Sequence, residues 1–441
     1  MDTPVYDFLK KYAKSDTIRM HMPGHKGRGL GDWLSVVYPL DITEISGADS
    51  LFDADGILAA SERNAASLFH TRATLYSTGG PTLCIQAMLA MMRQENRTVI
   101  AARNVHRSFL SACVLLGLQV QWVYPRYTGG LLSGEITPAA IEAALQKTEG
   151  PACVYVTSPD YLGKRADLAK ISAACRRHHA PLLVDNAHGA HLAFLEKNRH
   201  PIAYGADLCC DSAHKFLPAL TGAAYLHIGN ADYVPYAKGA MAMFGSTSPS
   251  YLTLGSLDLC NRYLAERAAR ELHTVLKRLK QLHTRISPPF VLYAGDGLHL
   301  TICAAESGIN GKKLAAALRM AGVECEYADD AFVVLLCAPT TTVAELDRLE
   351  ALLVGIGKRL GEPIPAVPFA PPILPCVMPM REAALAPYET IPVEEAVGRI
   401  CAAVHVPCPP AVPIAVSGEL ITPNCVNIFK RYSIFTVNVV K

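Results

Sequence analysis

Short apolar runs alternate with helix-length segments along residues 61–228, and this alternation constrains the fold more than any other feature of the chain. Each run is apolar on both faces, as expected for a strand buried inside a sheet. The segments between the runs have the apolar spacing of helices. Strand and helix in alternation predict βαβ units and a mostly parallel sheet, which is an α/β architecture. The runs cover residues 97–103, 120–125, 152–159, 181–188, 206–215 and 222–229.

The pattern changes along the chain and predicts three parts. We expect an N-terminal arm at residues 1–50, a large α/β domain at 51–284 and a smaller C-terminal domain at 285–441. A charged helical pattern over 256–283 leads from the large domain to the small one. Residues 362–379 include seven prolines. Because proline at this density excludes helix and inner strand, that segment is predicted to be an extended linker.

Charge and cysteine usage exclude several classes of protein. Lys+Arg (41) and Asp+Glu (39) nearly balance, so the composition does not predict a nucleic-acid partner or an anionic membrane. The N-terminus carries both charge signs and lacks the apolar core of a signal peptide. No uninterrupted apolar stretch reaches the ~18 residues of a membrane span. The 14 cysteines follow no regular spacing, which is typical of reduced thiols and favours a cytoplasmic location.

Asp185 and Lys215 each follow a buried apolar run, PLLV and ADLCC, and are 30 residues apart. Adjacent parallel strands bring both residues to the same edge of a sheet, where open α/β sheets bind ligands. A lysine there forms a Schiff base once its pKa is lowered, and an aspartate pairs with a pyridinium nitrogen. This is the pair of groups that pyridoxal 5'-phosphate (PLP) requires.

Other interpretations of this region stay open. Asp185 alone is also typical of a helix N-cap. Asp185, His188 and His191 have DxxHxxH spacing, which would suit a transition metal.

A phosphate site is predicted at residues 77–92, where a Gly-Gly turn precedes an amphipathic helix. Free backbone N–H groups at such a helix start favour an anion. Ser212, three residues before Lys215, adds a hydroxyl group. His106 follows the run at 97–103, where its flat ring could stack on a cofactor or be an ordinary loop histidine.

A set of motifs spans nearly the whole chain. They are HMPGHKGRG, NVHRSF, TSPDYLGKRADL, LLVDNAHGAH, GADLCCDSAHKFLPALTG, STSPSYLTLGSLD and AVGRICAAVHVPCPPAVPIAVSGE. Together they resemble the short form of the Orn/Lys/Arg decarboxylase family, whose members are fold type I PLP-dependent enzymes. The resemblance implies a three-layer, aspartate aminotransferase-like large domain that binds PLP, and a smaller α+β C-terminal domain.

The resemblance implies a role for each candidate residue. Lys215 is implied as the Schiff-base lysine, Asp185 as the partner of the pyridine nitrogen and His106 as the ring stacked on the cofactor. His188 and His214 are implied near the cofactor, and Ser212, Gly80 and Thr82 near its phosphate.

The same resemblance implies an activity and an assembly. The activity is decarboxylation of a basic L-amino acid to the amine and CO₂, with arginine first and lysine or ornithine next, in polyamine biosynthesis. The assembly is a homodimer or a higher homo-oligomer, in which Ser246 or Thr247 of STSPSY reaches the other subunit's phosphate. A cationic side chain needs an acidic partner in a closed site. We expect Glu419 to be that partner, with Asp296 as the second candidate.

Three departures from the family pattern leave alternatives open. Gly80-Pro81-Thr82 stands where Gly-Ser-Thr is common, so the phosphate turn lacks one hydroxyl and one N–H. Asn186 stands where an acidic residue is common, and Cys408 to Pro413 replace Tyr-Pro-Pro-Gly-Ile-Pro. The alternatives are an aminotransferase or lyase on the same fold, a drifted PLP-fold binding or regulatory protein, and a metal hydrolase.

Overall fold

The computed structural model describes most of the chain. Residues 408–411, which belong to the departing C-terminal motif, and residues 366–370 of the predicted linker lie outside the described part. The described residues are 1–31, 33–127, 130–365, 371–402 and 412–441.

Contacts between Cα atoms divide the chain into two compact units. Unit 1 contains residues 1–91, 181–274 and 338–340. Unit 2 contains residues 92–180, 275–337 and 341–441. The domain boundaries expected from the sequence stay a prediction.

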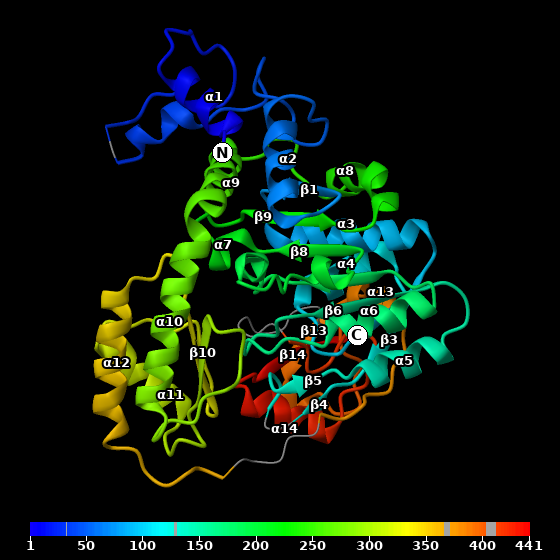
Figure 1. Ribbon diagram of the computed structural model, residues 1–441. Coiled ribbons are helices and arrows are strands. Elements are labelled where there is room, and N and C mark those ends of the chain that lie inside the picture. Colours follow the sequence, from blue (N-terminus) through cyan, green and yellow to red (C-terminus); the bar gives the residue numbers. More distant parts are fainter. Residues whose placement is uncertain (32, 128–129, 366–370, 403–411) are drawn as a thin grey trace. The chain divides into compact units, whose positions relative to one another are not determined.

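The secondary structure is a mixture of helices and strands, labelled in Figure 1. The α-helices are α1 (Pro4–Ala13), α2 (Ile57–Phe69), α3 (Gly80–Gln94), α4 (Arg107–Leu116), α5 (Pro138–Lys147), α6 (Leu168–Arg177), α7 (Ala213–Phe216), α8 (Val234–Ala242), α9 (Tyr251–Tyr263), α10 (Ala269–Ile286), α11 (Gly311–Met320), α12 (Val343–Gly357), α13 (Met380–Leu385) and α14 (Pro423–Arg431). The strands are β1 (Ala73–Ser77), β2 (Thr98–Ala102), β3 (Val120–Val123), β4 (Arg126–Tyr127), β5 (Gly134–Glu135), β6 (Ala152–Thr157), β7 (Leu182–Asp185), β8 (Leu208–Asp211), β9 (Ala224–Ile228), β10 (His299–Cys303), β11 (Tyr327–Ala328), β12 (Phe332–Leu336), β13 (Tyr388–Pro392) and β14 (Thr436–Val440).

Unit 1 contains four strands in the order β1-β9-β8-β7. β7 and β8 are parallel, with Asp185 opposite Cys210, and every residue of both strands is buried. β9 is antiparallel to both of its neighbours. The run at 222–229 therefore forms a strand, as predicted, but runs against β8. The connection between them holds only the one-turn helix α7 and no crossover helix of the kind that a parallel pair requires.

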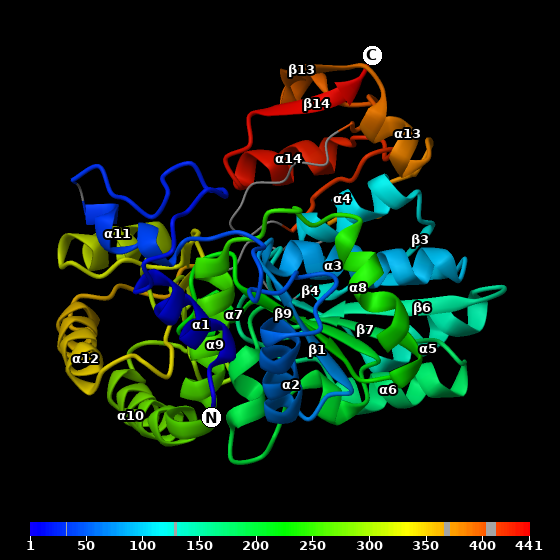
Figure 2. The same cartoon turned by 90° about the horizontal axis from the view of Figure 1, so that it is seen from above.

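Helices α1, α2 and α9 pack together beside β1 in unit 1 (Figure 2). Leu58 and Phe69 of α2 and Leu254 of α9 are buried in one apolar cluster with Tyr76 of β1. Asp49 caps the start of α2, because its carboxylate accepts backbone N–H groups from the first turn and the loop before it. The same cluster includes Ala213 of α7, the helix that contains Lys215.

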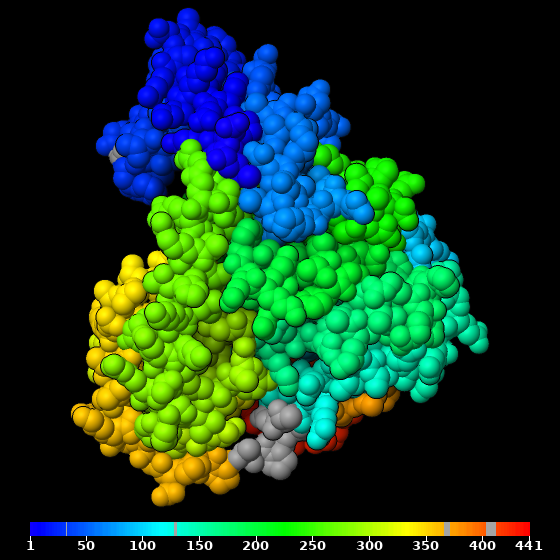
Figure 3. Space-filling view, viewed as in Figure 1, coloured from blue at the N-terminus to red at the C-terminus, as the bar shows by residue number. Residues whose placement is uncertain are grey.

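The N-terminal segment of unit 1 exposes large apolar side chains. Met20 is 87% exposed, Leu30 is 89% exposed and Trp33 is 78% exposed. Figure 3 shows this segment, in dark blue, at the surface. Among the described residues, none of the helices combines the length and the apolar character needed to cross a bilayer.

Unit 2 contains three parallel strands in the order β6-β2-β3. Capping residues fix the helices between them. α4 begins after the N-cap His106 and ends at Gly117, whose φ of 63° is a left-handed conformation that glycine adopts without strain. α5 begins at Pro138, directly after the capping residue Thr137.

Unit 2 also contains antiparallel sheets. β10, β12 and β11 form one sheet, and α11 and α12 share an apolar cluster with it. β13 pairs with β14, and α14 lies in a second apolar cluster with β14. Antiparallel strands packed with helices give the α+β character that the sequence predicts for the C-terminal part.

Candidate functional site

Lys215 lies in α7, directly after the carboxyl end of β8. Its side chain is half-buried, and its Nζ lies 2.8 Å from Nε2 of His188. One of these two nitrogens must accept the hydrogen bond, so either a lysine N–H donates to an unprotonated Nε2 or the imidazole N–H donates to a neutral amine. The structure thus brings together two of the residues that the sequence predicts at the site.

Asp185 is the last residue of β7 and is 2% exposed. Its Oδ1 accepts the backbone N–H of Ala187 at 3.1 Å and the thiol of Cys210 at 3.6 Å. Burial raises the pKa of Cys210 well above its usual value, so the sulfur stays protonated and acts as a donor. Asp185 is not a helix N-cap, because the next helix, η3 (Ala190–Phe194), begins after Gly189.

The alternative metal set does not assemble. Among the described residues, Asp185, His188 and His191 do not form a cluster of potential metal ligands. His191 is buried, and its ring packs 4.9 Å from that of Phe216.

The turn before α3 has the geometry of an anion cradle. Ser77 Oγ donates to the carbonyl of Gly80 at 2.9 Å and accepts the N–H of Gly79 at 3.2 Å. Gly80 has φ of 67°, and a Cβ added there would meet no atom within 4 Å, so the space beside the turn is open. The first-turn N–H groups of a helix have no partner within the helix and favour an anion. Thr82 lies in that first turn, and Pro81 contributes no N–H.

Ser212 and His214 lie close to Lys215 in the chain. Ser212 Oγ lies 3.3 Å from the His214 ring, whose Nδ1 lies 3.1 Å from the carbonyl oxygen of Ala223. Burial lowers the pKa of His214, which favours a neutral ring. Thr247 of the STSPSY segment is exposed to solvent in the single chain.

His106 lies in unit 2, after the carboxyl end of β2. Its Nδ1 accepts the backbone N–H of Ser108 at 3.2 Å. The hydrogen bond fixes the ring at the start of α4 and leaves Nε2 to carry the proton of the neutral form.

The two carboxylates predicted for substrate binding both have partners inside unit 2. Glu419 Oε2 pairs with Arg103 Nη2 at 2.9 Å, with both side chains at most 5% exposed. Burial raises the pKa of Glu419, while Arg103 acts in the opposite direction. Asp296 is fully buried, and both of its oxygens lie 2.9 Å from His299 Nδ1.

A buried cluster around Asp211 explains the Asn186 departure. Asp211 accepts hydrogen bonds from Asn186 Nδ2 at 2.6 Å, His200 Nε2 at 3.1 Å and His227 Nε2 at 3.1 Å. Burial alone would raise the pKa of Asp211, but the two histidines hold it below its usual range. An acidic side chain at position 186 would place a second carboxylate against the first. Sequence reasoning missed this cluster, although three of its members are buried polar residues next to or within predicted strands.

The Asp211 cluster is a hydrogen-bond network rather than a metal centre. His200, Cys209 and Asp211 lie close enough to share an ion. However, His200 Nδ1 accepts the N–H of Ile202, so its Nε2 carries a proton and donates to Asp211.

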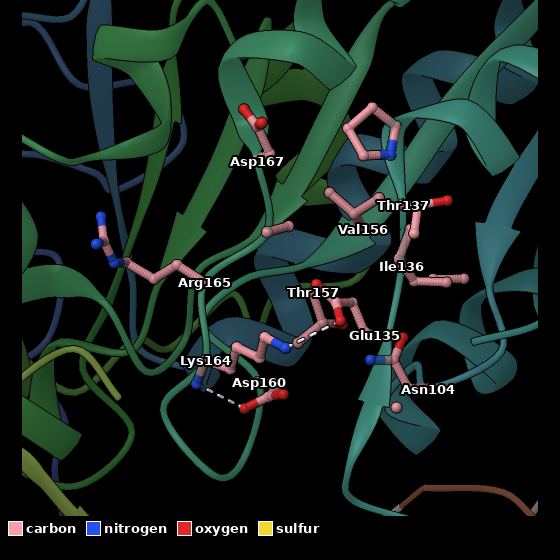
Figure 4. Close-up of a pocket in the computed structure, with 14 residues that line it drawn as sticks. Asn104, Glu135, Ile136, Thr137, Val156, Thr157, Asp160, Lys164, Arg165 and Asp167 are labelled. Atoms are coloured by element: carbon pink, nitrogen blue, oxygen red, sulfur yellow. Dashed lines mark hydrogen bonds and ion pairs between the residues drawn. The ribbon is translucent and has the colours of Figure 1, made fainter. Parts of the chain in front are cut away.

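A cavity in unit 2 contains further residues that the sequence did not single out (Figure 4). It lies at the carboxyl ends of β2 and β6, and its polar lining includes Asn104, Thr157 and Asp160. Asp160 follows the run at 152–159, so its strand-end position was the available signal.

Comparison with known proteins identifies a family and several relatives. The family model of Orn/Lys/Arg decarboxylase, major domain, matches residues 3–293. The arginine decarboxylase of Bacillus subtilis (strain 168) is 29% identical and covers 98% of this chain and 94% of that protein. The arginine decarboxylase of Halalkalibacterium halodurans is 30% identical, with coverages of 95% and 91%. The crystal structure of the Francisella novicida lysine decarboxylase LdcF shares the fold, with a TM-score of 0.83 at 15% identity, over 100% of this chain and 81% of that one.

Proposed function

The chain belongs to the Orn/Lys/Arg decarboxylase family and is a PLP-dependent amino-acid decarboxylase of fold type I, and from this premise we propose that its substrate is a basic L-amino acid, arginine first and lysine or ornithine next. The products are the corresponding amine and CO₂, and the amine enters polyamine biosynthesis. The relatives named arginine decarboxylase, which align over most of the chain, support arginine as the first choice. This ordering is an analogy between relatives.

The observation that carries the proposal is the contact between Lys215 Nζ and His188 Nε2 after the end of β8, whose neighbour β7 ends at the buried Asp185. Lys215 is proposed to bind the aldehyde of PLP. An ammonium group must lose a proton before it attacks a carbonyl, and His188 lies at hydrogen-bond distance to accept it. The open turn at Gly80, with Thr82 and Ser212, would hold the phosphate.

Asp185 is proposed to hold a proton on the pyridine nitrogen. Its Oδ1 is fixed by the N–H of Ala187 and the thiol of Cys210, so the carboxylate is oriented before a ligand arrives. When bound, PLP supplies an electron-accepting ring that stabilises the charge left at the α-carbon after CO₂ departs. His106 is proposed to lie against that ring and exclude water.

Turnover of an amino-acid panel tests the proposal. Purified protein loaded with PLP is incubated with arginine, lysine, ornithine and several uncharged or acidic amino acids, and CO₂ and amines are measured. We expect agmatine, cadaverine or putrescine in stoichiometric amount with CO₂. A keto acid product would identify an aminotransferase instead, and consumption of only an uncharged or acidic amino acid would refute the substrate assignment.

A further inference from the structure

The cavity in unit 2 is partly open, and its lining combines polar and apolar side chains. Its volume is about 220 Å³, whereas one water molecule occupies ~30 Å³ in the liquid. Val156 and Ile136 form apolar parts of the wall, and the loop after β6 forms the opposite side (Figure 4). His106, the proposed stacking residue, follows the same strand end as the cavity residue Asn104.

Two oxygen atoms of the lining lack a partner. Asn104 Oδ1 and Thr157 Oγ1 are buried and make no hydrogen bond within the described part of the chain. Buried polar atoms are paired in the great majority of native proteins. Two unpaired atoms in one cavity therefore point to a ligand that donates hydrogen bonds.

Asp160 adds a buried carboxylate to the same cavity and is 8% exposed. Its Oδ1 accepts the backbone N–H groups of Leu162 and Lys164, at 3.0 and 2.8 Å. Both bonds end on the same oxygen, and Figure 4 shows the other oxygen turned away from that backbone. Nothing in the described residues forms an ion pair with Asp160.

Two of the neighbouring charges have counter-ions, and Arg165 also lines the cavity. Lys164 Nζ pairs with Glu135 at 3.1 Å, and Asp167 pairs with Lys170 at 2.8 Å. Asp160 is the buried carboxylate of this cavity for which the described residues supply no ion pair within 4 Å.

We propose that this cavity binds an organic cation with several N–H donors, of the guanidinium or ammonium type, and that Asp160 is its counter-ion. A guanidinium group presents a planar fork of five N–H donors, which matches a carboxylate, an amide oxygen and a hydroxyl better than a single point charge does. The inference rests on the proposed function, because the cation would be the end group of the basic substrate or of the amine formed from it. Asp160 then takes the role that the sequence analysis expected of Glu419 or Asp296, which already pair with Arg103 and His299.

Agmatine binding to the PLP-loaded enzyme tests the assignment directly by calorimetry, without turnover. Asp160→Asn keeps an oxygen for the two backbone N–H groups but removes the charge. Asp167→Asn is the matched control, because asparagine also caps α6 and the lost charge is already paired with Lys170. We expect Asp160→Asn to weaken agmatine binding at least about tenfold and Asp167→Asn to change it by less than about twofold.

The kinetic arm identifies the source of the cation. If the site takes the substrate, agmatine competes with arginine and Asp160→Asn raises the KM for arginine. If the site takes only the free amine, Asp160→Asn weakens agmatine binding but leaves the KM for arginine unchanged. Agmatine binding to Asp160→Asn with wild-type affinity would overturn the inference, whether or not arginine is turned over. If the wild-type enzyme does not turn over arginine but still binds agmatine in a way that depends on Asp160, only the proposed substrate is refuted.

Discussion

At the scale of single residues, Lys215 is the decisive test of cofactor attachment. Lys215→Ala removes a side chain that combines a strand-end position in unit 1 with a 2.8 Å contact to His188. We expect loss of nearly all turnover, at least about 10³-fold, because covalent attachment is lost. Borohydride reduction of the wild-type protein followed by peptide mapping should place the pyridoxyl group on Lys215. Pyridoxyl on Lys164 or Lys238 would contradict the assignment.

Asn186 is predicted to stabilise the fold because its neutral amide donates a hydrogen bond to Asp211. Asn186→Asp places two carboxylates at the 2.6 Å contact, so one must take up a proton or lose its partner. We expect a loss of about 2–4 kcal/mol in the free energy of unfolding, measured with urea. The double variant Asn186→Asp with Asp211→Asn restores one carboxylate and one amide, and should recover part of the loss. Wild-type stability of Asn186→Asp would show that the contact is unimportant.

Asp160 is predicted to make cation binding depend on pH near neutrality. Burial raises the pKa of Asp160 to about 7, against the two backbone N–H groups and the charges of His299 and Lys164. A protonated carboxyl has no charge to offer, so agmatine affinity should rise as the pH rises, by roughly tenfold between about pH 6 and pH 8.

Other titratable groups near Asp160 set the control for this pH profile. Glu135 pairs with Lys164, and Tyr293 faces Asp160, which contributes to raising the pKa of that phenol. In Asp160→Asn these groups remain, and the rise in affinity should disappear. The same pH profile in Asp160→Asn would assign the titration to one of them.

At the scale of elements, the start of α3 is where Pro81 replaces the serine that is common in the family, and we expect this replacement to change the affinity for PLP. Proline is tolerated in the first turn of a helix, where the N–H has no partner within the helix. Pro81→Ser returns an N–H and a hydroxyl to the open space beside Gly80. We expect PLP to bind roughly three- to tenfold more tightly, measured by titration of the cofactor-free protein.

Pro138→Ser is the matched control for Pro81→Ser, because Pro138 begins α5 in the same way in unit 2. Both substitutions should cost about 0.4–1 kcal/mol of stability through the unfolded chain. Only Pro81→Ser should change the affinity for PLP. Equal effects of the two variants on PLP would mean that the phosphate turn is not the cause.

Local pattern was sufficient to predict the elements that carry the candidate site. The runs at 152–159, 181–188 and 206–215 contain β6, β7 and β8, because a fully buried strand leaves a continuous apolar signature. The direction of β9 was not predictable from its run, since direction depends on the length of the connection and not on strand composition. The contacts of Glu419 with Arg103 join residues 316 positions apart, and no local pattern encodes them.

At the scale of the whole molecule, the exposed residues of unit 1 bear on the assembly. Thr247 is exposed, and the segment with Met20, Leu30 and Trp33 leaves large apolar surface uncovered. Exposed apolar surface of this kind favours association. We therefore propose a homodimer in which Thr247 reaches the phosphate site of the other subunit.

Mixing inactive variants tests whether the site is shared. Lys215→Ala chains lack the cofactor lysine, and Thr247→Asp chains would place a negative charge beside the other subunit's phosphate. In a mixed dimer, one site combines an intact Lys215 with an intact Thr247, and the other site carries both lesions. Random exchange of subunits makes half of the dimers mixed, so activity should return to about a quarter of the wild-type level. Lys215→Ala chains mixed with chains that carry both substitutions should stay inactive. If activity fails to return although co-purification of differently tagged chains confirms mixed dimers, or if a monomer is fully active, each site is built from one chain alone.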